Sequence, residues 1–303
     1  MMDDAERALL DVGLQLRALD YTFTTITPET HRRNNARAPS CARSLRDVFG
    51  WSRPFSPDLL PPPMLSALRA ANAVAPADEL LRATVRFSTL AGSLYVHSAY
   101  PTIDANAVFF GPDTVRYCGL LARTVRAARR CVDIGCGSGA GGLSLASRVE
   151  RIVLTDLNEH ALRYARVNAR LAGVADRVEL ACGDLLAPVE GELDLVIANP
   201  PYLVDGRERA YRDGGGSLGE GLAVRIVEQA RARLRPGGKL VLYTGAPIVD
   251  GCDRVLSSIT PLLDGMTWTY EELDPDVFGE ELDEPAYAAV ERIAVVALVA
   301  TVA

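Results

Sequence analysis

A short turn with two prolines follows the apolar run LDLVIA at residues 193–198. It reads Asn199, Pro200, Pro201, Tyr202. Successive prolines fix the backbone and end the strand, so carbonyl oxygens are held outward. The side-chain oxygen of Asn199 and the carbonyl of Pro200 can accept both N–H bonds of one planar amino group, and Tyr202 offers a ring face. Asn199, Pro200 and Tyr202 are therefore candidate catalytic residues, and all four are candidate substrate contacts. A plain Asn-Pro turn is the alternative.

A glycine-rich turn lies upstream, in the run VDIGCGSG at residues 132–139. Glycines permit positive φ and let a ligand approach the backbone closely, so such a turn can wrap a nucleoside-linked chain. On its own it is also compatible with a dinucleotide site or a simple tight turn. The candidate cofactor contacts here are Asp133, Gly135, Cys136 and Gly137.

Two further carboxylates end the next two apolar runs. Asp156 ends RIVLTD and can accept hydrogen bonds from both hydroxyls of a ribose, while Asp184 ends VELACGD and can accept from the amine of adenine. Their neighbours Leu157 and Leu185, together with Asn199, complete the predicted cofactor contacts. A nicotinamide cofactor would use Asp156 in the same way, but has no standard need for Asp184 or for the proline turn.

The elements that position these residues alternate between apolar strands and helical segments from about residue 105. This alternation predicts an α/β fold with a Rossmann-like, seven-stranded, mostly parallel sheet and helices on both faces. The carboxyl ends of its parallel strands should gather the candidate residues at one edge. The predicted strands lie within 130–135, 151–156, 178–184, 193–201, 238–245, 266–273 and 292–300.

Residues 1–104 predict a small N-terminal α+β domain, and residues 105–303 predict the sheet domain. Two runs, 80–90 and 93–100, should pair as a hairpin around Ala91 and Gly92. Short helices followed by a hairpin would suit a degenerate winged helix, for recognition of nucleic acid or substrate. A lid or a dimerisation element is the simpler interpretation, and we favour it. Helices are predicted at 3–19, 44–49 and 64–75, with an irregular stretch at 21–43.

The order DIGCGSG, TDLNEHAL, ACGD, ANPPY resembles the class I S-adenosylmethionine-dependent methyltransferases of the N-P-P-Y group. That group includes glutamine N5-methyltransferases of release factors and ribosomal proteins, and adenine N6-methyltransferases. The resemblance covers residues 105–303. It implies S-adenosylmethionine as cofactor and N-methylation of an amide, guanidinium or amine on a small molecule or protein side chain.

One element of that group matches in part. The run Gly111–Thr114 resembles a Pro-Asp-Thr element that closes over the cofactor. The glutamine enzymes carry an Arg before the Pro and a Glu after the Thr, whereas this chain has Gly111 and Val115. This difference counts against a glutamine acceptor and leaves the assignment of the cofactor intact.

Two polar segments are candidates for acceptor binding. Residues 271–284 hold eight carboxylates and no basic residue, and Glu281 is the candidate contact among them. A negative rim favours a cationic acceptor and disfavours nucleic acid. The glycine-rich loop after Tyr202 is the second segment, and its candidates are Arg207, Arg209, Tyr211, Arg212 and Asp213. A solvated surface is the alternative for both segments.

Composition bounds the remaining possibilities. The 303 residues carry a net charge of -7, contain no apolar run of about 18 residues, and start with an acidic rather than a signal-like segment. Six scattered cysteines without metal-ligand spacing predict reduced thiols and no metal. We therefore expect a cytoplasmic enzyme that does not engage a membrane. Two other classes stay open: an NAD-dependent oxidoreductase and a non-catalytic recognition module.

Overall fold

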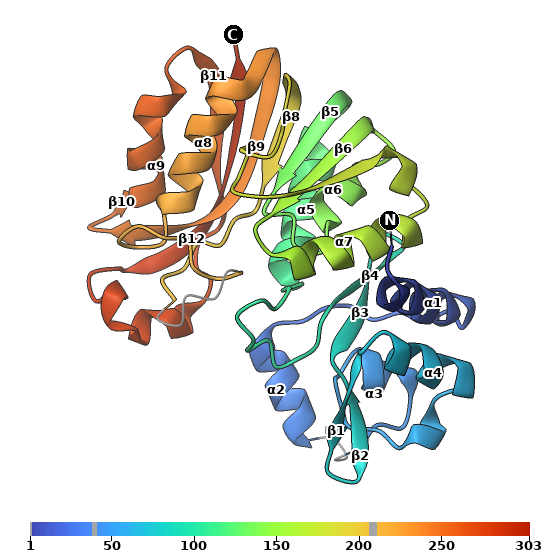
Figure 1. Ribbon diagram of the computed structural model, residues 1–303. Coiled ribbons are helices and arrows are strands. Elements are labelled where there is room, and N and C mark those ends of the chain that lie inside the picture. The colour runs from blue at the N-terminus through green and yellow to red at the C-terminus, as the bar shows by residue number, and fades with distance from the viewer. Residues whose placement is uncertain (1, 38–40, 206–210) are drawn as a thin grey trace.

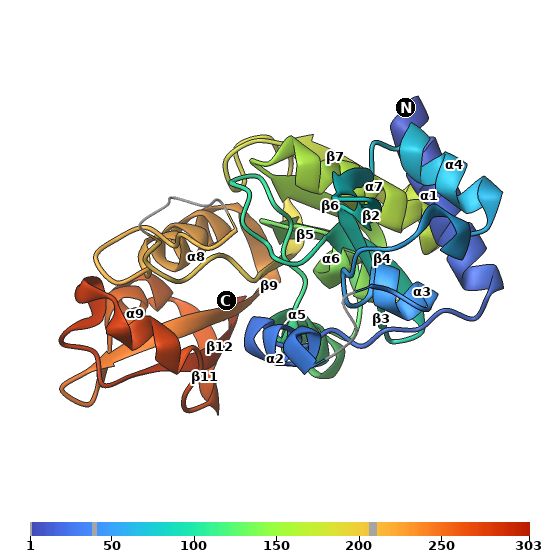
Figure 2. The ribbon, with the colours of Figure 1, turned by 90° about the horizontal axis from the view of Figure 1, so that it is seen from below.

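The computed structural model describes residues 2–37, 41–205 and 211–303. A large sheet with flanking helices forms its C-terminal part, and the N-terminal helices and hairpins gather below it (Figure 1). The two parts are in contact along helix α7 (Glu159–Leu171), as Figure 2 shows from below.

Seven long strands lie in the order β11-β12-β9-β8-β5-β6-β7. The pairs from β7 to β9 are parallel, whereas β12 is antiparallel to both β9 and β11. This arrangement confirms the predicted Rossmann-like α/β sheet. The strands are β5 (Ala128–Ile134), β6 (Val149–Asp156), β7 (Val178–Cys182), β8 (Leu193–Ala198), β9 (Leu234–Val249), the short β10 (Cys252–Asp253) that pairs with β9, β11 (Met266–Asp274) and β12 (Arg292–Val302).

Helices cover both faces of the sheet. Successive side chains of a strand point to opposite faces, so buried neighbours in one strand need a covering layer on each side. In β8, Leu195 and Ile197 join the core beneath α5, α6 and α7, whereas Val196 and Ala198 join the core beneath α8 and α9. In the described residues, no helix has the length and apolar character needed to cross a membrane. The helices are α5 (Pro112–Thr124), α6 (Ala140–Ser144), α7 (Glu159–Leu171), α8 (Gly221–Arg233) and α9 (Arg254–Ile259), with short 3-10 turns η2 (Ala175–Arg177), η3 (Thr260–Leu263), η4 (Gly279–Asp283) and η5 (Pro285–Tyr287).

Helices and two hairpins form the N-terminal part. The predicted hairpin around Ala91 and Gly92 is confirmed, and both turn residues have positive φ. The elements are α1 (Asp4–Ala18), α2 (Pro28–Arg37), α3 (Leu45–Phe49), η1 (Pro57–Leu59), α4 (Pro62–Ala70), the hairpin of β1 (Val74–Ala77) and β2 (Leu80–Ala83), and the hairpin of β3 (Val85–Leu90) and β4 (Ser93–Ser98).

Three predictions for this part are wrong. The helix predicted at 64–75 ends at Ala70, and β1 begins at Val74 within the predicted range. Residues 21–43 are not irregular throughout, because α2 forms within them; the Thr27 hydroxyl accepts from the N–H of Thr30, and His31 is the buried contact. The run 80–90 is not one strand. It breaks at Thr84, whose N–H donates to the carbonyl of Ala73, so β2 folds back onto β1 instead.

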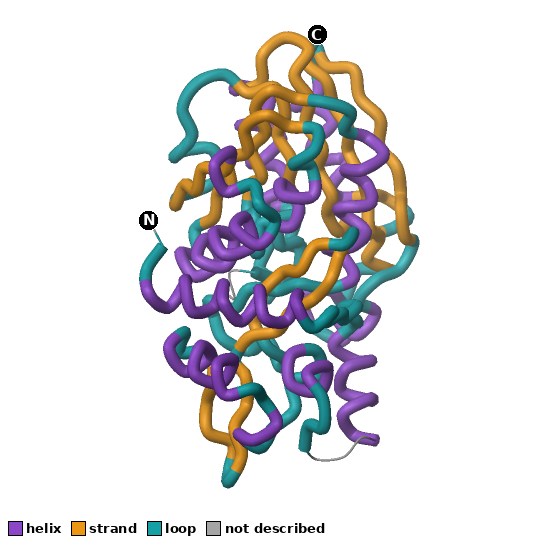
Figure 3. Tube along the Cα trace, turned by 90° about the vertical axis from the view of Figure 1, so that its right-hand side faces the viewer, coloured by secondary structure: helices purple, strands orange, loops and turns teal. Residues whose placement is uncertain are grey.

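The N-terminal part packs against α7, and Asn168 in this helix connects the two. Figure 3 shows the large sheet in the half of the molecule that holds the C-terminus, with helices and short hairpins in the other half. The side chain of Asn168 exchanges hydrogen bonds with both backbone groups of Val96 in β4, at 2.8 and 3.0 Å. It also donates to the carbonyl of Ser138 in the glycine-rich turn, at 2.8 Å. One apolar core runs from the N-terminal helices into α7. The division into domains 1–104 and 105–303 therefore stays a prediction.

Candidate active site

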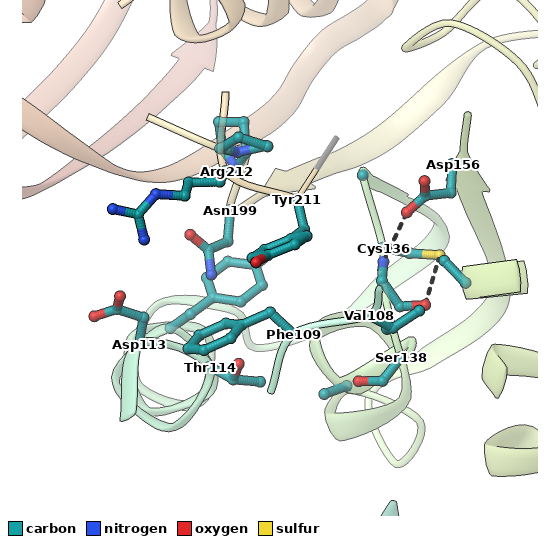
Figure 4. A pocket seen from close by; sticks show the side chains of 18 of the residues that line it. Val108, Phe109, Asp113, Thr114, Cys136, Ser138, Asp156, Asn199, Tyr211 and Arg212 are labelled. Carbon is teal, nitrogen blue, oxygen red and sulfur yellow. Dashed lines mark hydrogen bonds between the residues drawn. The ribbon is translucent and has the colours of Figure 1, made fainter. Parts of the chain in front are cut away.

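A cavity of about 200 Å³ opens at the carboxyl ends of β5, β6 and β8. Figure 4 shows the glycine-rich turn and Asp156 on one side of it, and Asn199, Tyr211 and Arg212 on the other. The sequence-predicted residues that line it are Asp133, Gly135, Cys136, Gly137, Asp156, Asn199, Pro200, Pro201, Tyr202, Tyr211 and Arg212.

The glycine-rich turn presents an open backbone to the cavity. Gly135 and Gly137 have φ of 62° and 53°, a region that disfavours side chains. A Cβ at Gly135 would have no atom within 4 Å, and one at Gly137 would meet only Val108, at 3.8 Å. The space beside this turn can therefore hold a ligand against the main chain, as a nucleoside-linked cofactor requires.

Asp156 stands where β6 ends and accepts hydrogen bonds on both oxygens. The N–H of Gly137 donates to Oδ2 and the N–H of Asn158 donates to Oδ1, each at 2.9 Å. A carboxylate has about four acceptor positions, so both oxygens can still accept from ribose hydroxyls. Burial raises the pKa of this carboxyl, and the two N–H bonds act against the rise.

Asp133 is a fully buried carboxyl beneath the same turn, 2% exposed. It accepts from the N–H of Gly142 at 2.7 Å and from the hydroxyl of Tyr117 at 3.3 Å, so it fixes the start of α6. Burial raises its pKa to about 7. Because it also lines the cavity, a bound cation would favour its ionised form.

The side chain of Asn199 lies in the cavity beside the rings of Tyr211 and Phe109 (Figure 4). It is half-buried and makes no hydrogen bond with the residues that the structure describes. Its amide oxygen is therefore available to a ligand. Pro200 and Pro201 line the same wall.

Tyr202 is anchored rather than free to move. Its ring lies so close to Gly245 that a Cβ there would come within 2.2 Å of it. Its hydroxyl donates to Oδ2 of Asp113 at 2.7 Å, and the hydroxyl of Tyr243 donates to Oδ1 at 3.0 Å. Arg116 adds an ion pair to Asp113 at 3.1 Å. The partial Pro-Asp-Thr element thus holds the proline turn directly.

Phe109 is a lining residue that the sequence analysis did not identify. Its ring is nearly parallel to that of Tyr211, with centroids 6.3 Å apart and an interplanar angle of 11°. It also covers Gly111, where a Cβ would come within 2.3 Å of the ring. The sequence signal was present in the apolar run AVFF just before Gly111. Gly111, where this chain differs from the glutamine enzymes, therefore makes room for the ring of Phe109.

Four predicted contacts do not line the cavity. Leu157 is 65% exposed and Leu185 is buried in the core beneath α8. Asp184 forms an ion pair with Arg225, and Glu281 forms one with Arg212. Their roles in binding stay predictions. The candidates Arg207 and Arg209 lie outside the described residues.

The acidic segment 271–284 reaches the cavity, because Phe278 lines it. Part of its charge is already balanced by arginines. Such pairs reduce the attraction that the segment exerts on a free cation. The pairs are Glu271–Arg123 at 3.3 Å, Glu272–Arg292 at 3.0 Å, Asp274–Arg116 at 3.1 Å and Glu281–Arg212.

Comparison with known proteins relates this cavity to a family. Residues 107–248 match the family model described as methyltransferase small domain. The chain is 42% identical over 130 residues to the release factor glutamine methyltransferase of Moorella thermoacetica, covering 38% of this chain and 45% of that protein. It is 30% identical over 169 residues to the ribosomal RNA small subunit methyltransferase C of Pasteurella multocida, covering 55% and 47%. The chain thus spans about half the length of these curated relatives.

Solved structures agree on the fold. The Trm5b structure from Pyrococcus abyssi matches with a TM-score of 0.52 and 18% identity, covering 75% of this chain and 62% of that chain. The M. jannaschii tRNA m1G37 methyltransferase matches with a TM-score of 0.50 and 14% identity, covering 72% and 57%. S-adenosylmethionine is the cofactor of the matched family, which decides between the two cofactors that the glycine turn and Asp156 leave open. Residues 107–248 therefore form a class I S-adenosylmethionine-dependent methyltransferase domain, which matches the methyltransferase small domain.

Proposed function

We propose that this chain transfers a methyl group from S-adenosylmethionine to a planar nitrogen of its acceptor. One observation carries the proposal: the turn Asn199–Tyr202 shares a cavity with the glycine-rich turn and Asp156. When bound, S-adenosylmethionine supplies a methyl group activated on a sulfonium. Gly135, Gly137 and Asp156 would hold it, with Asp133 behind them.

The residues of the turn would orient the nitrogen. The Asn199 side-chain oxygen and the Pro200 carbonyl accept its two N–H bonds, which directs the nitrogen lone pair at the methyl group. Orientation of this kind can lower a barrier by up to roughly 7 to 11 kcal/mol in favourable reactions. As the N–C bond forms, the C–S bond breaks and the sulfur leaves as a neutral thioether, while the nitrogen releases one proton to solvent. Asn199 acts through position and takes up no proton itself. The Tyr202–Asp113 bond keeps the turn in place.

A carboxamide is the acceptor group that the site supports best, on a protein side chain or a small molecule. The near-parallel rings of Phe109 and Tyr211 offer flat apolar faces to a planar neutral group. The arginine pairs of the acidic segment reduce the advantage of a guanidinium or an amine. Relatives named as release factor glutamine methyltransferases also support an amide.

An exocyclic amino group of a nucleic-acid base is the second candidate. The relative named as a ribosomal RNA methyltransferase favours it, and a base would fit the same aromatic faces. The net charge of -7 counts against a large phosphate-binding surface, so we place it after the carboxamide.

A labelled-methyl screen tests the proposal. The enzyme is incubated with S-adenosylmethionine that carries a deuterated methyl group and with separate pools of peptides, RNA and guanidino or amino metabolites. Mass spectrometry then locates the label. We expect it on nitrogen, in a glutamine or asparagine of the peptide pool. Label on carbon or oxygen would refute N-methylation, and label on a base would select the second candidate.

A further inference from the structure

Arg86 is a buried cation that has no hydrogen-bonding or ionic partner among the described residues. Its side chain, in β3, is only 5% exposed. It makes no hydrogen bond or ion pair within residues 2–37, 41–205 and 211–303, and its Nε and Nη2 are buried donors without acceptors. Its guanidinium carbon lies 5.3 Å from the centroid of the Phe23 ring. Desolvation lowers its pKa to about 10, so it stays charged near neutral pH.

Arg86 lines a small cavity separate from the main part of the cofactor cavity, with a volume of about 10 Å³. A volume of this size corresponds to about one water-sized occupant. Pro28 and Phe109 line both cavities, so the small one lies directly behind the aromatic wall of the proposed active site.

The groups around Arg86 offer no negative charge. No carboxylate lines this cavity among the described residues. Burial lowers the pKa of His31 to about 4 and that of His97 well below its usual value, so both rings are neutral near pH 7. Both nitrogens of His97 have partners, in Ser88 and the Ser98 carbonyl.

His31 leaves one atom open to the cavity. Its Nε2 lies 2.8 Å from the carbonyl oxygen of Trp51, to which it donates, and its Nδ1 is buried without a partner. A water molecule could accept from Arg86 and donate to this nitrogen. It would leave the buried charge uncompensated, however, and an unpaired buried charge costs far more than a neutral polar group.

We propose that this cavity is a binding site for a small monovalent anion, which accepts from Nε and Nη2 of Arg86. A halide ion is a single charged atom and matches a site of this size. It supplies the missing charge and the acceptor that both donors lack. This site is independent of the methyl-transfer proposal.

Thermal unfolding of the full chain tests the site. The buffer contains sodium gluconate, whose anion is too large for the cavity, and chloride replaces it at constant ionic strength up to about 100 mM. We expect the melting temperature to rise by about 2 °C or more. Acetate, which has four heavy atoms, is also too large for the cavity and should give no rise.

Two variants show whether the effect belongs to Arg86. Arg86→Met should lose the response, because the donors and the charge are gone. Arg46→Met is the matched control and should keep it, since Arg46 contacts the same Phe23 ring at 5.7 Å but is exposed.

Crystals of the wild-type protein soaked in sodium bromide give a second measurement that does not depend on folding of a variant. We expect an anomalous peak within hydrogen-bond distance of Arg86. Equal responses of the wild type and Arg86→Met would overturn the proposal. So would a wild type that neither responds to chloride nor shows bromide at Arg86, and water would then be the occupant.

Discussion

The hydroxyl of Tyr202 donates a 2.7 Å hydrogen bond to Asp113, although 89 positions separate the two residues. Asp113 lies in the first turn of α5 and Tyr202 ends the proline turn, so this bond joins two walls of the proposed active site. Buried bonds to a carboxylate are strong when all partners are in place. The geometry of the turn should therefore depend on this contact.

Removal of that hydroxyl should affect both stability and catalysis. Tyr202→Phe is expected to lower the free energy of unfolding by about 1 to 3 kcal/mol, because it leaves a buried carboxylate short of one donor. Tyr270→Phe is the matched control, since Tyr270 donates a bond of the same length to Asp253 at a partly buried position. Urea denaturation measures the change in the free energy of unfolding. Turnover that falls equally in both variants would contradict a role for Tyr202 in the turn.

Asp156 should decide cofactor affinity. Asp156→Asn is expected to weaken S-adenosylmethionine binding by about 10-fold to 100-fold, the range for a hydrogen bond to a charged group. Asp184→Asn should change the affinity little if Asp184 serves only its ion pair with Arg225. Isothermal titration calorimetry compares the two. A larger loss in Asp184→Asn would support the predicted contact between Asp184 and the adenine.

Cofactor affinity should rise with pH through the titration of Asp133, whose pKa burial raises to about 7. In the free protein, the raised pKa of Asp133 makes a contribution to folding stability that depends on pH. This contribution is fully present below about pH 4 and is lost as the pH rises through about 7. A cationic cofactor favours the ionised form, so binding should strengthen from pH 6 to 8. Calorimetry at several pH values checks this, and Asp133→Asn should flatten the profile. An equal pH dependence in Asp133→Asn would exclude Asp133 as its source.

Asn168 should couple the N-terminal part to the glycine-rich turn. Asn168→Ala removes three hydrogen bonds to buried backbone groups and is expected to cost about 2 to 5 kcal/mol in unfolding free energy. Hydrogen exchange should increase in β4 and near Ser138. Asn35→Ala, which removes two partly buried bonds, one to the Trp51 carbonyl and one from Nε of Arg53, is a control with a smaller cost. Unchanged exchange at Ser138 would show that the turn is held without Asn168.

Much of this architecture could be predicted from the sequence, for physical reasons that differ between its parts. The buried strands are predictable because parallel strands covered on both faces read as continuous apolar runs, as LDLVIA does. Helix α2 was missed because His31 is its one buried residue, so it has no apolar stripe to detect. The hairpin of β1 and β2 was missed because the break at Thr84 depends on a tertiary contact with Ala73.

The candidate site also contains residues that the sequence indicates and contacts that only the folded chain creates. Local chemistry indicated Asn199 and Asp156, because proline turns and strand ends have local consequences. It could not show that Phe109 lies against Tyr211, or that Arg212 takes up the charge of Glu281, because these pairs meet only in the folded chain.

The central claim is that Asn199 acts mainly by orienting the acceptor nitrogen, so that its predicted contact with the cofactor adds little to cofactor affinity. Its most direct test is to measure, for Asn199→Ala and the wild type, both the dissociation constant for S-adenosylmethionine and the rate of methyl transfer to the acceptor found by the labelled-methyl screen. We predict a rate about 100-fold to 1,000-fold lower, as for loss of an orienting donor or acceptor in an active site, with the dissociation constant nearly unchanged. A rate close to that of the wild type at saturating cofactor would contradict the account.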